Sequence, residues 1–384
     1  MTAKAAIWCP PLRAGWGNIG RILSYGVAGL VVALPCRLPA APVAVPAASK
    51  PAAGAKPAAI TKPAASKPAA PKSAEATKPA EAKPAAARTT GAPNPRDIET
   101  ILRLQVFLDR RGFGPGKVDG KLGEFTSKAV DCFNTTVGLE PGDYSAVLKE
   151  SDGLDVFSSY TVREADVAWV DASLSTKPAQ QAKAQFMHYR SLAEFVAERF
   201  HTDEPWLARA NPTVKVAALK PGDALRVPNV VPFEIDKLPR PQQWAADPVF
   251  ANRLAVVDTT YKFVCIFEAG KMLAAFPITP GEDRFVPRGN WKVVIMQAWP
   301  TFRWDKSMLQ EGKRSNEFHM LPAGPNSPVG VLWAGLDKSG IGLHGTASPE
   351  TIGRSRSAGC VRLANWDAVR LPVFLRPGCP VVIR

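Results

Sequence analysis

The last third of the chain consists of short apolar segments divided by turns. Segments of this length that are rich in Val, Ile, Phe and Tyr and bounded by Gly or Pro predict strands. Several such strands in succession are typical of a β-sandwich or a barrel-like domain. We therefore expect a mostly β, sandwich-like domain over residues 250–384, with its first strands at 254–258, 261–267, 272–278 and 291–296.

A pattern with helical spacing begins near residue 96. Gly112 stands where the C-terminal cap of a first helix is expected, and the turn-rich loop 112–120 follows it. A second helix should begin near Thr126 or Ser127. We therefore expect a small all-α domain over residues 96–150, in whose first helix five residues recur at helical spacing: Ile98, Ile101, Leu102, Gln105 and Leu108.

The segment that follows mixes both kinds of pattern. A short strand is expected at 160–162 and another at 225–228, and an apolar helical stripe lies between them. The two strands and the helical stripe predict a small α+β domain over residues 155–232. The stripe consists of Leu192, Phe195, Val196 and Phe200.

The first 37 residues resemble an export segment in composition. Lys4, Arg13 and Arg21 supply a positive start, and the apolar stretch 22–36 follows them. Its length suits the apolar part of a signal peptide better than a stable membrane span. We expect residues 1–37 to be a cleaved signal peptide or an uncleaved N-terminal anchor; a buried helix of a cytosolic protein is the alternative.

Residues 38–95 have low complexity, with Lys-Pro-Ala-Ala repeated five times. A segment without aromatic residues cannot bury enough apolar surface to fold, and so we expect a disordered Lys/Pro/Ala linker. The formal charge of +14 favours an anionic partner. The linker is either a plain spacer or one whose lysines contact an anionic surface. Because an exported protein does not meet chromosomal DNA, we expect no nucleic-acid partner.

One pair of residues carries a candidate chemistry. His344 is followed sixteen residues later by Cys360. A nucleophilic cysteine needs a neighbouring base, because the thiolate is the reactive form, and a histidine can serve as that base. Gly359 lets a substrate approach the backbone closely, and the amides of residues 358–360 can form an oxyanion hole. The alternative is a core histidine and a buried thiol that never react together.

The residues around this pair resemble the motif of L,D-transpeptidases, His-Gly-Thr followed by Ser-x-Gly-Cys-x-Arg. The resemblance spans about residues 250–384 and implies that Cys360 is the nucleophile, that His344 is its base and that the Gly345 carbonyl orients the imidazole. Four further residues of the motif would shape the substrate and oxyanion site: Ser357, Ala358, Gly359 and Arg362. The histidine precedes the cysteine, which argues against a papain-like peptidase.

The two smaller domains also resemble known families. Residues 96–150, with Gly112-Phe113, Pro115-Gly116 and Val118-Asp119-Gly120, are similar to the three-helix peptidoglycan-binding domain. Residues 155–232 are similar to the LysM motif, from which an extra stretch of about 24 residues, 167–190, departs. These resemblances imply binding to peptidoglycan stem peptides and glycan strands. The alternatives are a helical spacer and a LysM-like fold that does not bind sugar.

Together the resemblances imply a cell-wall enzyme in the periplasm or cell envelope. It would form peptidoglycan cross-links, or anchor a wall lipoprotein, through a cysteine acyl-enzyme on tetrapeptide stems. Water as the acceptor would make it an L,D-carboxypeptidase, and a degenerate catalytic domain would leave a non-catalytic peptidoglycan-binding protein. We expect no cofactor and no metal, and contact with the membrane only through an uncleaved N-terminal segment.

Overall fold

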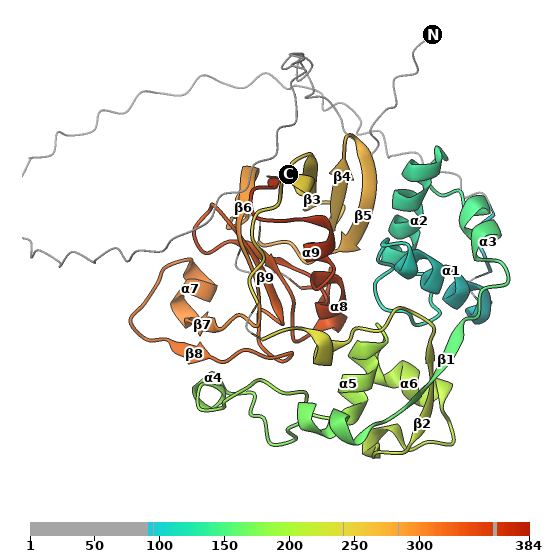
Figure 1. The fold of residues 1–384 in the computed structure, drawn as a ribbon, viewed down its shortest axis with the longest axis horizontal. Helices are drawn as coiled ribbons and strands as arrows, with labels where there is room; N and C mark the ends of the chain where they lie inside the picture. Colours follow the sequence, from blue (N-terminus) through green and yellow to red (C-terminus); the bar gives the residue numbers. More distant parts are fainter. Residues whose placement is uncertain (1–90, 95, 241, 283, 356–358) are drawn as a thin grey trace, which may run out of the picture. The chain divides into compact units, whose positions relative to one another are not determined.

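The computed structural model describes residues 91–94, 96–240, 242–282, 284–355 and 359–384 (Figure 1). The predicted export segment 1–37 lies outside the described residues, as does nearly all of the predicted linker 38–95. Among the helices of the described part, none is long and apolar enough to span a membrane.

Three helices form the first described part of the chain: α1 (Ile98–Arg110), α2 (Glu124–Val137) and α3 (Ser145–Ser151). The Asp97 side chain caps α1 by accepting a hydrogen bond from the Thr100 amide. Helix α2 begins at Glu124, two residues before the predicted start, and ends at Gly138, which adopts the left-handed conformation that favours glycine. The first two of these helices therefore lie where the sequence pattern predicted them.

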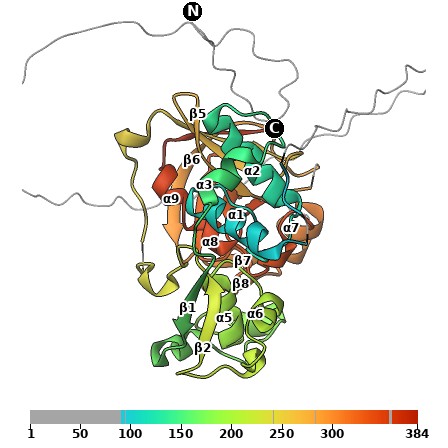
Figure 2. The same ribbon diagram turned by 90° about the vertical axis from the view of Figure 1, so that its right-hand side faces the viewer.

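The next part contains a strand, two helices and a second strand in this order. Strand β1 (Phe157–Thr161) pairs antiparallel with β2 (Ala224–Pro228), and α5 (Leu192–Arg199) and α6 (Glu204–Ala210) lie between them in sequence. In Figure 2 these four elements lie together at the lower end of the view. The remaining short elements are η1 (Glu164–Trp169), α4 (Pro178–Gln181), η2 (Val216–Ala218) and η3 (Ile235–Lys237).

The last part is mostly β, as predicted, and is built on one eight-stranded sheet with the order β11-β10-β9-β6-β12-β3-β4-β5. The pairs β12–β3 and β10–β11 are parallel, and the other neighbours are antiparallel. The strands are β3 (Arg253–Asp258), β4 (Phe263–Glu268), β5 (Lys271–Pro277), β6 (Gly289–Ala298), β9 (Leu332–Leu336), β10 (Gly342–His344), β11 (Val361–Arg362) and β12 (Pro380–Ile383).

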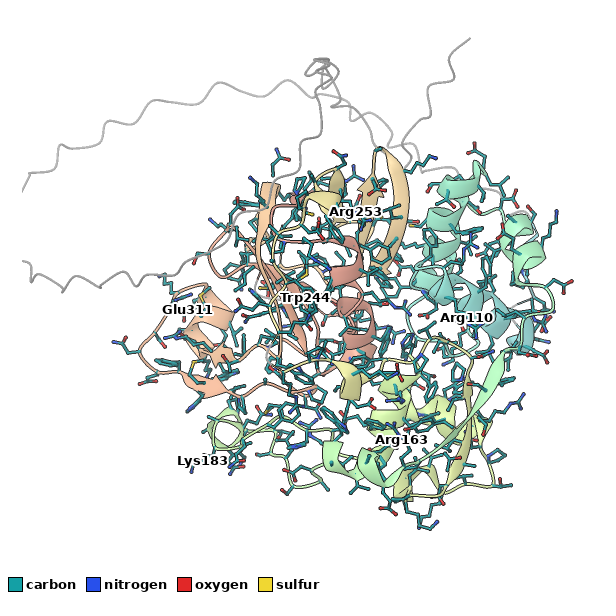
Figure 3. The ribbon with its side chains drawn as sticks, in the orientation of Figure 1. Arg110, Arg163, Lys183, Trp244, Arg253 and Glu311 are labelled. Carbon is teal, nitrogen blue, oxygen red and sulfur yellow. The ribbon has the colours of Figure 1, made fainter. Side chains whose placement is uncertain are left out.

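This sheet curls until its two edges meet. Just beyond β5, Thr279 pairs with Arg362 of β11, each amide donating to the other's carbonyl at 2.9 and 3.0 Å. Side chains from both ends of the strand order share one apolar core, in which Ile266 and Leu343 are fully buried. Trp244 packs against this core (Figure 3). The strands thus form one continuous curled sheet, where the sequence predicted a sandwich-like arrangement.

Short helices and a hairpin complete this part. Helices α8 (Asn365–Ala368) and α9 (Leu371–Phe374) follow β11, and η4 (Pro248–Phe250) and η5 (Pro349–Thr351) lie in loops. A separate hairpin pairs β7 (Phe302–Trp304) with β8 (His319–Leu321), and α7 (Lys306–Glu311) lies between its strands. The buried Asp305 carboxylate holds the hairpin by accepting from the amides of Met308 and Ser315.

Buried polar contacts join the helical part to the sheet. Asp109 of α1 is fully buried and accepts hydrogen bonds from Arg370, at 2.7 Å, and from His201, at 2.9 Å. Burial lowers the pKa of His201, and so Arg370 is the charged partner of Asp109 at neutral pH. The Gly114 amide also donates to the carbonyl of Ala275 in β5 at 2.8 Å. One carboxylate thus connects α1, the segment after α5 and the segment after α8.

We predict that Asp109→Asn lowers the free energy of unfolding of the full chain by about 3–5 kcal/mol, because it leaves the Arg370 charge buried without its partner. Urea unfolding measures the change. Asp152→Asn, at an exposed position, is the matched control and should change the free energy by less than about 0.5 kcal/mol. Equal effects of the two substitutions would contradict the role given to the buried ion pair.

Candidate active site

Parallel pairing of β10 and β11 brings the two predicted catalytic residues to one place. His344 ends β10, and Cys360 immediately precedes β11. In the register, Leu343 faces Val361 and His344 faces Arg362. Fifteen residues separate His344 from Cys360, and those that the structure describes, 345–355 and 359, lie outside the strands of the sheet. Both side chains therefore line the same pocket.

The His344 imidazole is buried, with 3% of the residue exposed, and it is held by one hydrogen bond. Its Nδ1 lies 2.6 Å from the carbonyl oxygen of Gly345. A carbonyl oxygen can only accept, and so Nδ1 carries the proton and Nε2 is the unprotonated nitrogen. The ring of Trp333, which faces His344 across the β9–β10 pair, stacks on the imidazole with centroids 5.5 Å apart. This tautomer leaves Nε2 able to accept a proton.

Burial sets the charge state of both groups. It raises the pKa of the Cys360 thiol to about 11, although the Gly342 amide and the Arg362 charge favour the thiolate. It also lowers the pKa of His344 to about 4, against the effect of the hydrogen bond to Gly345. At neutral pH the resting site therefore contains a neutral thiol and a neutral imidazole.

The backbone before the nucleophile is packed so closely that only glycine fits. Gly359 has a φ of +103°, and a Cβ there would lie 3.0 Å from the carbonyl oxygen of Phe285. A Cβ on Gly281 would lie 2.5 Å from the Cα of Gly359. The predicted site residues Ser357 and Ala358 lie outside the described residues.

The pocket in front of Cys360 has a volume of about 460 Å³. One of its walls comes from the β7–β8 hairpin and α7, and Pro328 and Val329 form another part of it. Arg362 brings a positive charge to the same pocket. The sequence did not predict the part that the hairpin plays in the pocket, because no motif marks its residues. The residues that it contributes to the lining are Phe302, Arg303, Trp304, Met308, Leu309 and Arg314.

Asn365 supports the turn at Gly345 from behind. Its Oδ1 accepts from the Val331 amide at 3.2 Å, and its Nδ2 donates to the carbonyl of Pro325, also at 3.2 Å. A Cβ on Gly345 would lie 2.1 Å from that Oδ1, and so the amide packs directly on the residue whose carbonyl orients His344.

The fourth contact of Asn365 comes from the α5 segment. Its Nδ2 also donates to Oε1 of Glu198 at 3.0 Å, while the Tyr189 hydroxyl donates to Oε2 at 2.5 Å. Burial raises the pKa of Glu198 to about 8. A buried side chain of the middle part thus reaches the segment that supports the active site.

The described residues contain no group of three or more His, Cys, Asp and Glu side chains that could hold a metal ion. No disulfide joins the four described cysteines, Cys132, Cys265, Cys360 and Cys379. The catalytic pocket is lined by the Cys360 thiol, the His344 imidazole and three guanidinium groups, those of Arg303, Arg314 and Arg362.

Comparisons with known proteins agree with this geometry. Residues 252–383 match the family model of the YkuD L,D-transpeptidase catalytic domain. The chain is 25% identical over 191 residues to a Bacillus licheniformis protein named as the L,D-transpeptidase YkuD, which covers 50% of this chain and 92% of that protein. The chain is also 35% identical over 71 residues to the Bacillus subtilis protein of the same name, but this match covers only 43% of that protein.

Solved structures overlap with the chain only loosely. An L,D-transpeptidase from Mycobacterium smegmatis has 16% identity and a TM-score of 0.29, over 48% of this chain and 86% of that one. One from Enterococcus faecium has 18% identity and a TM-score of 0.27, over 36% of this chain and about half, 51%, of that one. Overlaps of this size say nothing about activity. The family match covers the curled sheet and both catalytic candidates, and residues 252–383 are therefore an L,D-transpeptidase catalytic domain, which is an acyltransferase.

Proposed function

We propose that this protein is a cell-wall L,D-transpeptidase that acts on the peptide stems of peptidoglycan. The observation that carries the proposal is the His344 tautomer, fixed by the Gly345 carbonyl in the pocket that Cys360 also lines. The substrate class follows from the catalytic domain at residues 252–383. Cys360 would attack the peptide carbonyl of diaminopimelate in a tetrapeptide stem and expel the terminal D-Ala.

The neutral resting pair determines how the first step proceeds. The thiol proton moves to Nε2 of His344 as the sulfur bonds to the carbonyl carbon, because neither group is charged beforehand at neutral pH. The resulting imidazolium gives the proton to the leaving amine of D-Ala when the carbon–nitrogen bond breaks. A thioester and free D-Ala are the products of this half-reaction.

The thioester is then resolved by an amine that loses its proton to the same imidazole. A second stem's diaminopimelate gives a cross-link between third residues, a lipoprotein lysine anchors that protein, and water releases the stem. Arg362 and the amides near Gly359 and Cys360 are suited to stabilise the negative oxygen of each tetrahedral intermediate. The resemblance implies that Ser357 and Ala358 would also shape this site.

The N-terminal parts fit the same function. Residues 96–150 and 155–232 would bind peptidoglycan and hold the catalytic domain near its polymeric substrate, which raises the effective concentration of stems. The export segment 1–37 would deliver the enzyme to the periplasm or cell envelope, and the linker 38–95 would give it reach. A non-catalytic wall-binding protein is disfavoured because the histidine and the cysteine share one pocket.

We predict that a carbapenem acylates purified full-length protein once, on Cys360, since L,D-transpeptidases as a family react with these drugs. Intact mass and peptide mapping locate the adduct. Cys360→Ser should abolish it, because a hydroxyl is a far weaker nucleophile without a stronger base. Cys379→Ser, at a buried thiol elsewhere in the domain, is the matched control and should retain it. An adduct that persists in Cys360→Ser would refute the assignment of the nucleophile.

The charge states predict an unusual pH dependence. The pKa of His344 near 4 keeps its base form available above pH 5, and the pKa of Cys360 near 11 keeps the free thiolate scarce below pH 9. The acylation rate of the wild type should therefore be nearly constant between these limits. His344→Ala should be slower by about 10²–10⁴-fold at neutral pH and should gain about tenfold per pH unit, as direct thiolate formation takes over. Parallel pH profiles of the two proteins would show that His344 is not the base.

A further inference from the structure

Two adjoining pockets form a groove that shares no lining residue with the catalytic pocket. The first has a volume of about 200 Å³ and the second about 280 Å³. Lys117, Pro349 and Glu350 line both of them, which makes the two continuous. The walls come from the α1–α2 loop, from the segment 189–204 around α5, and from residues 347–354, which lie in sequence between His344 and Cys360.

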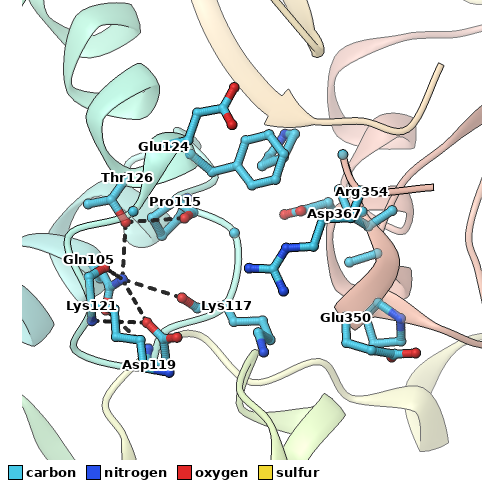
Figure 4. A pocket seen from close by; sticks show the side chains of 18 of the residues that line it. Gln105, Pro115, Lys117, Asp119, Lys121, Glu124, Thr126, Glu350, Arg354 and Asp367 are labelled. Atoms are coloured by element: carbon cyan, nitrogen blue, oxygen red, sulfur yellow. Dashed lines mark hydrogen bonds between the residues drawn. The ribbon is translucent and has the colours of Figure 1, made fainter. Parts of the chain in front are cut away.

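The first half of the groove presents hydrogen-bond donors. Arg354 and Lys121 line it, and Figure 4 shows the Arg354 guanidinium extending into the cavity. Neither forms an ion pair with another residue that the structure describes, whereas Glu124, on the same wall, is paired with Lys128. The indole Nε1–H of the buried Trp366 has no hydrogen-bond partner among the described residues. These groups suit a carboxylate.

Asp367 supports this assignment. It is 1% exposed, and its carboxyl group faces the cavity in Figure 4. Its Oδ1 lies 3.8 Å from Nη1 of Arg370 but has no hydrogen-bond partner in the described structure. Burial raises the pKa of Asp367 to about 8. The group is therefore mostly protonated at neutral pH and can donate a hydrogen bond to an anion.

The second half of the groove is acidic. Glu194, Glu204 and Glu350 line it, and burial together with the charges of Glu194 and Asp203 raises the pKa of Glu204. Two basic residues also line this half of the groove. Lys117 forms an ion pair with Asp203, and Arg190 is the second basic residue.

An amide adds an acceptor to these carboxylates. Asn326 lines the same half, is 3% exposed, and has an Oδ1 without a hydrogen-bond partner among the described residues. Three glutamates beside an unused acceptor suit a ligand that brings positive charge and N–H donors. This half of the groove fits an ammonium group.

We propose that this groove is a second binding site for a peptide that carries both a carboxylate and an ammonium. The carboxylate lies against Arg354 and Lys121, and the ammonium lies against Glu204 and Glu194. This rests on the proposed function, under which such a peptide is a peptidoglycan stem, because diaminopimelate carries both groups. A neutral glycan strand would leave the charges of both halves without partners. The groove thus holds wall peptide beside the active-site segment while Cys360 reacts.

The test uses the full chain with its catalytic pocket blocked by a carbapenem on Cys360. The probe is the tripeptide L-alanyl-γ-D-glutamyl-meso-diaminopimelate, titrated by calorimetry. We expect Arg354→Gln and Glu204→Gln each to raise the dissociation constant about tenfold, the size expected for a charged hydrogen bond. Arg110→Gln (labelled in Figure 3) and Glu140→Gln, both exposed and outside the groove, are the matched controls and should bind as the wild type does.

Modified probes assign the two ends. Acetylating the diaminopimelate amine should weaken binding to the wild type about tenfold and remove the effect of Glu204→Gln. Amidating the diaminopimelate carboxylate should likewise weaken binding to the wild type about tenfold and should remove the effect of Arg354→Gln. Equal affinity for all probes, equal affinity of all variants, or displacement by a neutral chitooligosaccharide would overturn the inference.

The outcomes also separate this inference from the proposed function. An adduct on Cys360 without groove-dependent binding refutes the groove alone. Absence of the adduct refutes the proposed function. In that case the tripeptide is titrated into Cys360→Ala protein, and the groove is supported only if Arg354→Gln and Glu204→Gln weaken binding in that protein too. Thermal unfolding of each variant shows that it is folded; both substitutions are at exposed positions.

Discussion

The fully buried carboxylate of Asp109 is the contact on which the arrangement of the described chain depends. It pairs with Arg370 beyond α8 and with His201 beyond α5, so that residues from three stretches far apart in sequence meet around one charge. His201 also stacks on Trp366, with ring centroids 5.5 Å apart. An ion buried in this way is costly unless each partner is in place. The helical part and the sheet therefore favour one relative position, and that position creates the groove between them.

A second buried polar contact extends this connection to the active site. Glu198 accepts from Asn365, whose Oδ1 packs on Gly345 and whose Nδ2 holds Pro325. Gly345 in turn fixes the His344 tautomer. The geometry of the catalytic base thus depends on a chain of contacts that begins on α5, outside residues 252–383. The catalytic domain and the segment before it act as one structure in positioning the imidazole.

The sequence predicted local features well because they depend on local physics. The apolar spacing around Ile101 and Leu108 predicted α1, and the apolar runs at 254–258 and 272–278 predicted strands β3 and β5. The His344 and Cys360 pair was recognised from its motif, and β10–β11 pairing places both in one pocket.

What the sequence did not predict involves contacts between distant segments. The closure of the sheet through Thr279 and Arg362 joins two edges that no periodicity relates, and so the apolar runs left both a sandwich and a barrel-like domain open. His201 has an ordinary sequence context, and only the fold shows that it is buried against Asp109. The pKa values of His344 and Cys360 likewise follow from burial, which residue identity does not determine.

The central claim is that Cys360 and His344 carry out acyl transfer on wall stems. Mass spectrometry of disaccharide-tetrapeptides incubated with the purified full-length protein tests it most directly. The account predicts loss of the terminal D-Ala and products joined between their third residues, or tripeptide stems where water is the acceptor, with no change when Cys360→Ala protein is used. Intact tetrapeptides after incubation with the wild type, or the same products with Cys360→Ala, would contradict it.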